Sequence, residues 1–255
     1  MPNSQGRFAW HELSTTDRGA AATFYSKITP WKTEESELAD NYTLFTNGGT
    51  PMAGALVLDP ELAARNIPAH WLAYVCVYDV DACARQVPRL GGRVVSGPHE
   101  VPGVGCWVVI SDPQGATIGM YEPDQPRPAY GGAPPVGEFS WHELATTDHK
   151  AAFDFYHPLF QWEKITEFDM GAMGIYFIFG QKGQQYGGMF NRPPQIPVSN
   201  WLSYVRVGDV KTAAQTAQQL GAKVMHGPEE VPGGDWIAQC MDPQGAPFAL
   251  HTPKS

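Results

Sequence analysis

The chain has 255 residues, of which 43% are hydrophobic and 12% aromatic, and this composition supplies packed cores and excludes an intrinsically disordered protein. Its net charge of -9 comes from scattered Asp and Glu residues, so nucleic acids and anionic membranes are unexpected partners and a small molecule is favoured. No apolar run approaches the roughly 20 residues of a membrane span, and the first residues lack a signal-peptide core, so the sequence predicts a cytoplasmic protein.

The first structural signals are a strand and a helix. Residues 10–15, WHELST, alternate along a strand; Thr16 and Asp17 then supply a helix cap, and apolar residues recur at helical spacing over 17–28. Short apolar runs on either side of an Asn-Gly-Gly turn, within residues 42–58, predict a hairpin.

The same order starts again at Trp71. The strand WLAYVCV is followed by DVDACARQVPRLGG, which predicts a helix closed by its pair of glycines, and then by strand-like runs at 92–95, 106–111 and 117–122. Two βαβββ units therefore account for the first half of the chain.

The second half repeats the first. FAWHELSTTD at Phe8–Asp17 returns as FSWHELATTD at Phe139–Asp148, with eight of ten positions identical, and DPQGA at Asp112 recurs at Asp242. A period this long indicates duplicated domains rather than a solenoid. The residues between the copies, PDQPRPAYGGAPPVG, predict a semi-extended linker. We expect domains at 1–122 and 138–255, joined by a linker at 123–137.

With these motifs in place, the sequence resembles the vicinal oxygen chelate superfamily, which includes glyoxalases, bleomycin resistance proteins and extradiol dioxygenases. The likeness rests on HELSTTD…FY, DVD…LGGRV…GP and DPQGATIGMYEP, each of which is repeated in the second half. Within the superfamily, the chain most resembles tandem-domain antigen-type glyoxalase-like proteins. The resemblance implies an α+β fold in which two βαβββ units form an open eight-stranded half-barrel with flanking helices. It also implies that the concave face holds the site.

Metal-dependent members of the family carry ligands at positions that this chain fills with other residues. The Glu of the last strand falls at Gly119 and Ala249, and the His on the first strand of the second unit falls at Leu72 and Leu202. None of these four residues can bind a metal. We therefore predict no metal and no other cofactor.

His11 and His142 lie one residue from the family's ligand position on the opening strand, which is occupied by Trp10 and Trp141. Because side chains alternate along a strand, the two histidines are expected to face the helices, with Leu13. A bulge in the strand would change this register, so a metal-dependent lyase or dioxygenase stays an alternative.

The same alternation predicts which side chains line the concave faces. The first half offers Trp10, Glu12, Ser14, Leu72, Tyr74, Cys76 and Tyr121, and the second offers Trp141, Glu143, Ala145, Leu202, Tyr204, Arg206 and His251. We expect Trp10, Tyr74, Tyr121, Trp141, Tyr204 and Arg206 to bind a ligand, and Glu12, Glu143 and His251 to be the catalytic candidates.

The second face is chemically richer, because it combines a carboxylate with a cation and an imidazole. Arg206 would orient an anionic or carbonyl group, Tyr204 would donate a hydrogen bond, and Glu143 or His251 would move a proton. Structural roles are the alternative: the glutamates accept hydrogen bonds from tyrosines, Arg206 pairs with Glu143, and Trp10 forms cavity wall.

Three functions are compatible with these residues. The first is a metal-independent glyoxalase-like protein that binds a small organic molecule and acts on it as a lyase or isomerase of activated carbonyl compounds. The second is a sequestering binder of the drug-resistance type, and the third is the metal-dependent enzyme. Because the tandem chain supplies four units covalently, either a monomer or a homodimer is compatible with the family's way of pairing units.

Overall fold

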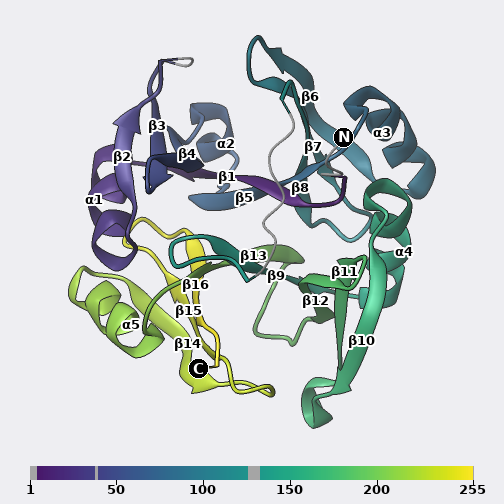
Figure 1. Ribbon diagram of the computed structural model, residues 1–255. Helices are drawn as coiled ribbons and strands as arrows, with labels where there is room; N and C mark the ends of the chain where they lie inside the picture. Colours follow the sequence, from purple (N-terminus) through teal and green to yellow (C-terminus); the bar gives the residue numbers. More distant parts are fainter. Residues whose placement is uncertain (1–4, 38–39, 126–132, 255) are drawn as a thin grey trace. The chain divides into compact units, whose positions relative to one another are not determined.

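The computed structural model describes residues 5–37, 40–125 and 133–254. Each half of the chain contributes one mixed sheet of eight strands (Figure 1). The first sheet has the order β2-β3-β4-β1-β5-β8-β7-β6 and consists of β1 (Phe8–Thr15), β2 (Lys32–Glu35), β3 (Tyr42–Asn47), β4 (Thr50–Val57), β5 (His70–Cys76), β6 (Arg93–Val101), β7 (Gly105–Ser111) and β8 (Thr117–Pro123).

The second sheet has the equivalent order β10-β11-β12-β9-β13-β16-β15-β14. Its strands are β9 (Phe139–Thr146), β10 (Glu163–Asp169), β11 (Ile175–Gln181), β12 (Gln184–Asn191), β13 (Asn200–Arg206), β14 (Lys223–Glu230), β15 (Trp236–Met241) and β16 (Pro247–Thr252). In both sheets, parallel pairs such as β1 with β4 and β9 with β12 lie beside antiparallel hairpins. The predicted α+β class with two open eight-stranded sheets is therefore confirmed.

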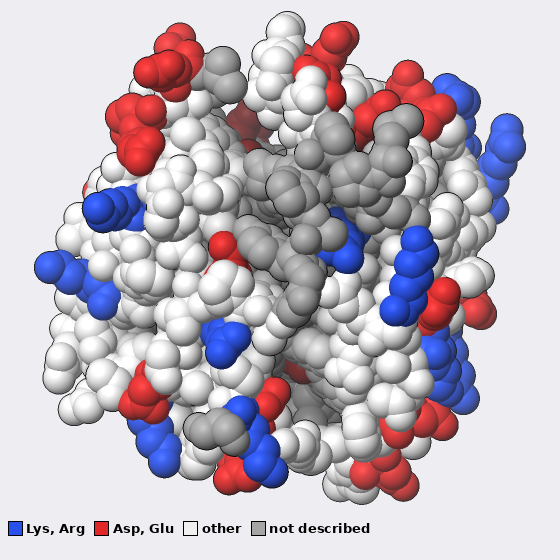
Figure 2. Space-filling view, in the orientation of Figure 1, with Lys and Arg blue, Asp and Glu red and all other residues white. Residues whose placement is uncertain are grey.

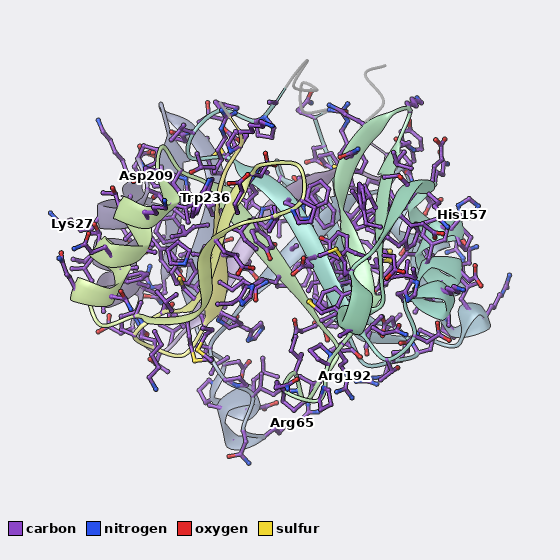
Figure 3. All side chains as sticks on the ribbon, turned by 90° about the horizontal axis from the view of Figure 1, so that it is seen from below. Lys27, Arg65, His157, Arg192, Asp209 and Trp236 are labelled. Carbon is purple, nitrogen blue, oxygen red and sulfur yellow. The ribbon has the colours of Figure 1, made fainter. Side chains whose placement is uncertain are left out.

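All five α-helices of the described residues begin at an aspartate that caps the first turn. These helices are α1 (Arg18–Ile28), α2 (Pro60–Ala64), α3 (Val80–Gln86), α4 (His149–Phe160) and α5 (Val210–Gln219), and the capping residues are Asp17, Asp59, Asp79, Asp148 and Asp209. Each capping carboxylate accepts from a backbone N–H that has no partner inside the helix. At the start of α5, Figure 3 labels Asp209 beside Trp236, and the Lys211 Nζ lies 3.7 Å from the centroid of the Trp236 ring.

Three details differ from the sequence reading. The helix expected to run to Gly91 ends at Gln86 and continues as a 3-10 turn (Val87–Leu90), because Pro88 lacks the N–H that an α-helix needs. A short helix, α2 (Pro60–Ala64), and a 3-10 turn (Gly171–Met173) were not expected. The strand-like run expected at 92–95 extends to Val101 as β6, through two register shifts.

Contacts divide the structure into two compact units, and each unit draws on both halves of the sequence. One joins α1 and β2–β4 with α5 and β14–β16, and the other joins α3 and β6–β8 with α4 and β10–β12. In the first unit, α1 and α5 lie side by side (Figure 1) over a core that includes Leu13, Phe24, Ala214 and Phe248. The predicted domain boundaries at residues 122 and 138 describe the repeat in the sequence, and they stay a prediction.

A buried chain of hydrogen bonds joins the two halves inside each unit. The indole of Trp71 donates to the Tyr25 hydroxyl at 2.8 Å, and this hydroxyl donates to the Asp242 carboxylate at 3.0 Å. Burial, reinforced by Asp242, raises the pKa of Tyr25, so the hydroxyl remains a donor. Trp201, Tyr156 and Asp112 repeat the chain in the other unit.

The glutamine of each DPQGA turn adds a second connection. Gln244 Oε1 accepts from the Thr15 hydroxyl at 2.5 Å, the Thr16 hydroxyl at 2.7 Å and the Asp17 backbone N–H at 2.6 Å, while its amide donates to the Asp17 carbonyl at 2.8 Å. Gln114 makes the same four bonds to Thr146, Thr147 and Asp148. The DPQGA and TTD motifs are therefore two sides of one contact.

The two histidines of the opening strands lie in these cores, as the alternation predicted. The rings of His11 and Phe139 stack at 3.5 Å between centroids, and those of His142 and Phe8 stack at the same distance. His142 Nδ1 lies 3.2 Å from the Tyr186 carbonyl, to which it donates. Burial lowers the pKa of His142 to about 3, so the imidazole is neutral in the folded protein.

Helix α4, at 12 residues the longest of the five α-helices, is well short of a bilayer span, and within the described parts of the chain no helix combines the length and hydrophobicity needed to cross a membrane.

Replacing Gln244 by Ala is expected to lower the free energy of unfolding by about 1–3 kcal/mol, because three donors at the end of β1 lose their acceptor. Urea unfolding followed by tryptophan fluorescence measures the change. Gln218→Ala, on the exposed face of α5, is the control and should change the value by less than about 0.5 kcal/mol. Equal effects in both variants would contradict the anchoring role of the turn.

Acid should destabilise the protein through His142. The unfolded chain takes up a proton at this residue as the pH falls below about 6.5, whereas the folded protein resists it down to about pH 3, so stability is lost across that interval. His142→Phe should therefore lose less unfolding free energy than the parent protein between pH 7 and pH 4. A variant at the exposed His226 should keep the parent's pH dependence, and an unchanged slope in His142→Phe would refute the assignment.

Candidate functional site

The first sheet carries a polar cluster built on β1, β3 and β4. The indole of Trp10 donates to the Tyr42 hydroxyl at 3.0 Å, and the hydroxyl donates to Glu12 Oε2 at 2.9 Å. Both Glu12 and Tyr42 are partly exposed. Burial, followed by the charge of Glu12, raises the pKa of Tyr42 well above its usual range, so the tyrosine is a permanent donor to this carboxylate.

A glycine makes room for this cluster. Gly54 is the register partner of Glu12 on the adjacent strand, and a Cβ atom placed on it would lie 2.0 Å from the Tyr42 hydroxyl oxygen. Any side chain at this position would displace the tyrosine ring from Glu12. The sequence reading placed Glu12 on this face but did not find Tyr42 or the role of Gly54.

The second sheet repeats the arrangement. The Tyr176 hydroxyl donates to Glu143 Oε1 at 2.8 Å, and Gly188, the register partner of Glu143, would bring a Cβ within 2.1 Å of the Tyr176 ring. A Glu–Tyr pair over a glycine therefore occurs in both copies. We call the pairs Glu12–Tyr42 and Glu143–Tyr176 the carboxylate–tyrosine pairs.

Tyrosines lie opposite Gly119 and Ala249, the two positions that correspond to the metal-binding glutamate of metal-dependent family members. Tyr74 is the register partner of Gly119, and a Cβ on Gly119 would lie 2.1 Å from the Tyr74 ring. Tyr204, which is 2% exposed, pairs in the same way with Ala249 and accepts a hydrogen bond from Gln239 at 2.6 Å. A glutamate at Gly119 would have to displace its tyrosine.

Elsewhere in the described residues, the possible ligands also do not form a set that fits a metal. Within residues 5–37, 40–125 and 133–254, no three His, Cys, Asp or Glu side chains are grouped in a way that could hold a metal ion. All four cysteines are free thiols, and burial raises the pKa of Cys83 and of Cys240 to about 11, which disfavours the thiolate form that binds metals.

Arg206 and His251 come together as register partners on β13 and β16. Arg206 donates through its guanidinium to the Pro134 carbonyl, while its Nε is buried and finds no hydrogen-bond partner among the described residues. Glu143 belongs to the other compact unit, where its Tyr176 bond lies. The combination of Glu143 with Arg206 and His251 therefore stays a prediction.

His251 has two polar partners that the sequence reading missed. Its Nδ1 lies 2.8 Å from Ser140 Oγ, and its Nε2 lies 3.1 Å from Asp235 Oδ2. Ser140 directly precedes Trp141, which is half-buried, and the only sequence signal was that Ser140 replaces Ala9 of the first copy. In the other unit, the Tyr121 hydroxyl donates to the Val104 carbonyl at 2.7 Å.

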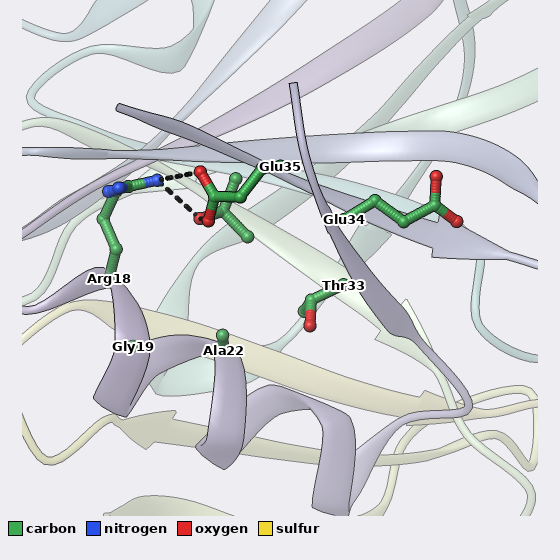
Figure 4. A pocket seen from close by; sticks show the side chains of 7 residues that line it. Arg18, Gly19, Ala22, Thr33, Glu34 and Glu35 are labelled. Atoms are coloured by element: carbon green, nitrogen blue, oxygen red, sulfur yellow. Dashed lines mark hydrogen bonds and ion pairs between the residues drawn. The ribbon is translucent and has the colours of Figure 1, made fainter. Parts of the chain in front are cut away.

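A separate pocket of about 270 Å³ lies between α1 and β2 (Figure 4). Arg18 bridges Glu35 at 3.0 Å and donates to the Thr43 hydroxyl at 2.7 Å, and this pairing lowers the pKa of Glu35. The Glu35 side chain is 70% exposed, so the ion pair contributes little to stability. Charged residues of both signs are dispersed over the face in Figure 2, which offers no broad cationic surface.

Gly54→Ala is expected to displace Tyr42 and to cost about 1–3 kcal/mol of unfolding free energy, because the added methyl overlaps the tyrosine hydroxyl. Gly208→Ala is the matched control, since a Cβ there meets no atom within 4 Å. Urea unfolding tests both. A Gly54→Ala variant as stable as the Gly208 variant would show that the tyrosine is not held in this place.

Comparison with known proteins accounts for both halves of the chain. A family described as "Glyoxalase-like domain" matches residues 10–119, and one described as "Glyoxalase/Bleomycin resistance protein/Dioxygenase superfamily" matches residues 138–250. "Putative glyoxylase CFP32" of Mycobacterium tuberculosis is 28% identical over 98% of this chain and 95% of its own length. The "Anthracycline biosynthesis protein DnrV" of Streptomyces peucetius is also 28% identical, over 96% of this chain and 92% of its own.

Solved structures share the fold at low sequence identity. The Mn(II)-bound glyoxalase from Novosphingobium aromaticivorans superimposes with a TM-score of 0.67 at 14% identity, over 99% of this chain and 83% of that one. The 2,3-dioxygenase LapB from Pseudomonas sp. KL28 gives the same TM-score at 12% identity, over 99% and 94%. With a family match in each half, this chain belongs to the glyoxalase/bleomycin resistance protein/dioxygenase superfamily, of which it carries two domains in tandem.

Proposed function

We propose that this protein binds a small organic molecule at its carboxylate–tyrosine pairs and does so without a divalent metal. The observation that carries the proposal is the recurrence, in both copies, of a partly exposed glutamate that accepts from a tyrosine hydroxyl above a glycine. Glu12 and Glu143 both keep partial solvent access, so a ligand can reach the two carboxylates.

The chemistry of the pair suits a ligand with a hydroxyl group or an acidic C–H next to a carbonyl. A carboxylate offers about four acceptor sites and is the proton acceptor of the pair, since the tyrosine beside it remains protonated. In the first copy the Trp10 indole polarises the Tyr42 hydroxyl, and its ring supplies an apolar surface beside Glu12. Glu12 and Glu143 are therefore the proposed proton acceptors.

Independence from metal is supported by the residues that occupy the expected ligand positions. A carboxylate at Gly119 would clash with Tyr74, and Ala249 lies opposite Tyr204. The metal-dependent lyase or dioxygenase gains no support from any group of donors in the described residues. Stoichiometric metal in protein purified without chelator would overturn this part of the proposal.

The remaining site residues keep the roles that the sequence suggested, as part of the proposal. Arg206 offers a cation to an anionic or carbonyl group, and His251 is the second candidate for proton transfer. The proposed walls of the ligand site are Trp141, Tyr204, Tyr74 and Tyr121.

The names of the relatives suggest two classes of ligand to test. One is named a glyoxylase and another an anthracycline biosynthesis protein, so an activated carbonyl compound and a polycyclic aromatic compound are the first probes. Turnover of the hemithioacetal formed from methylglyoxal and a thiol would identify a lyase or isomerase. Saturable binding of an anthracycline with no chemical change would identify the sequestering binder.

A cytoplasmic location and a state no larger than a homodimer complete the proposal. The four free thiols suit a reducing compartment, and the net charge of -9, with both signs dispersed on the face in Figure 2, favours neither nucleic acid nor an anionic membrane. Cell fractionation and analytical ultracentrifugation at micromolar concentration test these two points.

Glu12→Gln and Glu143→Gln are expected to weaken a bound ligand by ten- to a hundredfold each, because a charge-assisted hydrogen bond of about 1.5–3 kcal/mol is lost. Calorimetric titration with the two probe classes measures the loss. The second copy is expected to hold the principal polar site, so the Glu143 variant should lose more; a loss confined to Glu12→Gln would place the site in the first copy.

Two controls separate this site from the pocket at α1. Glu34→Gln and Arg18→Ala alter only the lining of that pocket and should leave the affinity unchanged. A ligand that responds to these variants and ignores the glutamate variants would move the binding site to the α1 pocket and refute the proposal.

A further inference from the structure

Three side chains in the second copy form a continuous hydrogen-bonded chain within one compact unit. Ser140 Oγ lies 2.8 Å from His251 Nδ1, and His251 Nε2 lies 3.1 Å from Asp235 Oδ2. Ser140 comes from the start of β9, His251 from the end of β16 and Asp235 from the turn before β15. Ser140 is about a hundred positions from the other two residues in sequence, yet the polar atoms of all three meet.

The partners of His251 determine its tautomer. A carboxylate can only accept, so the Nε2 atom beside Asp235 carries the proton. In the neutral imidazole, Nδ1 then has a lone pair, and this lone pair points at the Ser140 hydroxyl. The hydroxyl has two acceptors within reach, His251 Nδ1 at 2.8 Å and the Tyr204 carbonyl at 3.4 Å, and the nearer is the imidazole. In that bond it donates to a base that is oriented by a carboxylate, which is the arrangement that activates serine nucleophiles.

The first copy lacks all three residues. The repeat places Ala9 opposite Ser140, Tyr121 opposite His251 and Gly105 opposite Asp235. The structural motifs of the repeat are the same in both copies, whereas these three positions differ together, and the three residues of the second copy contact one another. A role restricted to the second copy explains the difference.

We propose that Ser140, His251 and Asp235 form a nucleophilic site that hydrolyses small activated esters and thioesters. Ser140 and His251 are partly exposed, and the Asp235 side chain is 42% exposed, so the chain of groups reaches solvent. Only a limited part of Ser140 is open, which favours a short acyl group. This activity goes beyond ligand binding at the carboxylate–tyrosine pairs and does not require it.

The reaction balances with water as the only co-reactant. Ser140 Oγ attacks the acyl carbon while its proton passes to His251 Nδ1, and the bond from carbon to the alcohol or thiol breaks as that proton moves to the leaving group. Water then attacks the acyl-serine, gives its proton to Nδ1, and the acid departs as the proton returns to Ser140. Asp235 is a positioning residue that stabilises the imidazolium formed in each step.

Arg206 supplies the positive charge that this reaction needs. It is the register partner of His251, so its side chain leaves the same face of the sheet one strand away. Negative charge develops on the carbonyl oxygen during the attack, and a nearby guanidinium stabilises it.

The test uses the full-length protein with p-nitrophenyl acetate and a fluorophosphonate. We expect a burst of about one nitrophenolate per chain, and a fluorophosphonate adduct that peptide mapping places on Ser140. Ser140→Ala should abolish both signals. His251→Asn should slow acylation by about a hundredfold, within the usual range for loss of a general base.

Asp235 and a second serine provide the controls. Asp235→Asn should lower the acylation rate at least tenfold with little change in KM, and Asp235→Glu should restore part of it, which a purely structural role would not predict. Ser96, whose Oγ lies 2.8 Å from His99 Nε2, is a Ser–His pair without a described carboxylate, so Ser96→Ala should react like the parent protein. Circular dichroism confirms that each variant is folded.

The outcomes are distinct from those of the binding proposal. A parent protein that shows no burst and no adduct, or a folded Ser140→Ala variant that keeps them, would overturn the nucleophilic site. Neither result would affect ligand binding, which is measured with the Glu12 and Glu143 variants. Conversely, loss of Ser140 labelling with normal binding of a ligand would separate the two activities.

Discussion

This structure depends on one contact between the two halves of the chain. A glutamine in the last turn of one half bonds to the end of the opening strand of the other half. Gln244 satisfies two threonine hydroxyls and a backbone N–H at the start of α1, and the turn that carries it also holds Asp242 beside Tyr25. The contact lies at the edge of a shared core, so the two halves of the chain bury their helices together.

This contact changes the meaning of the repeated motifs. WHEL, TTD, FY and DPQGA invite a search for catalytic residues, but most of their side chains pack or connect. His11 and His142 stack on phenylalanines, and Tyr25 and Asp242 complete a buried chain of hydrogen bonds. Two groups of residues have both access to solvent and side chains suited to proton transfer or nucleophilic attack. Glu12 and Glu143 recur in the two copies, whereas Ser140, His251 and Asp235 occur in the second copy alone.

The sequence predicted those parts of the molecule that follow from local patterns. Strand alternation placed the histidines in the core and Glu12 on the opposite face, and the Asp17 cap with the helical spacing behind it located α1. It did not predict that Tyr42 and Tyr176 bond to the glutamates, because these contacts depend on strand register and on a glycine that leaves room for a ring. Ser140 and Asp235 were missed for a related reason: each acquires its meaning from a histidine more than ten residues away in sequence.

The bonds of Gln114 and Gln244 also bear on how such a chain could arise. A single ancestral half would possess both the turn and the strand end, and two copies of it could make the same bonds between molecules in a symmetric dimer. Joining two copies turns an encounter between molecules into one within a molecule, at a high effective concentration that no longer depends on expression level. The two copies are then free to diverge wherever the shared contact is not involved, and the difference between Ala9, Gly105 and Tyr121 in one copy and Ser140, Asp235 and His251 in the other is such a divergence.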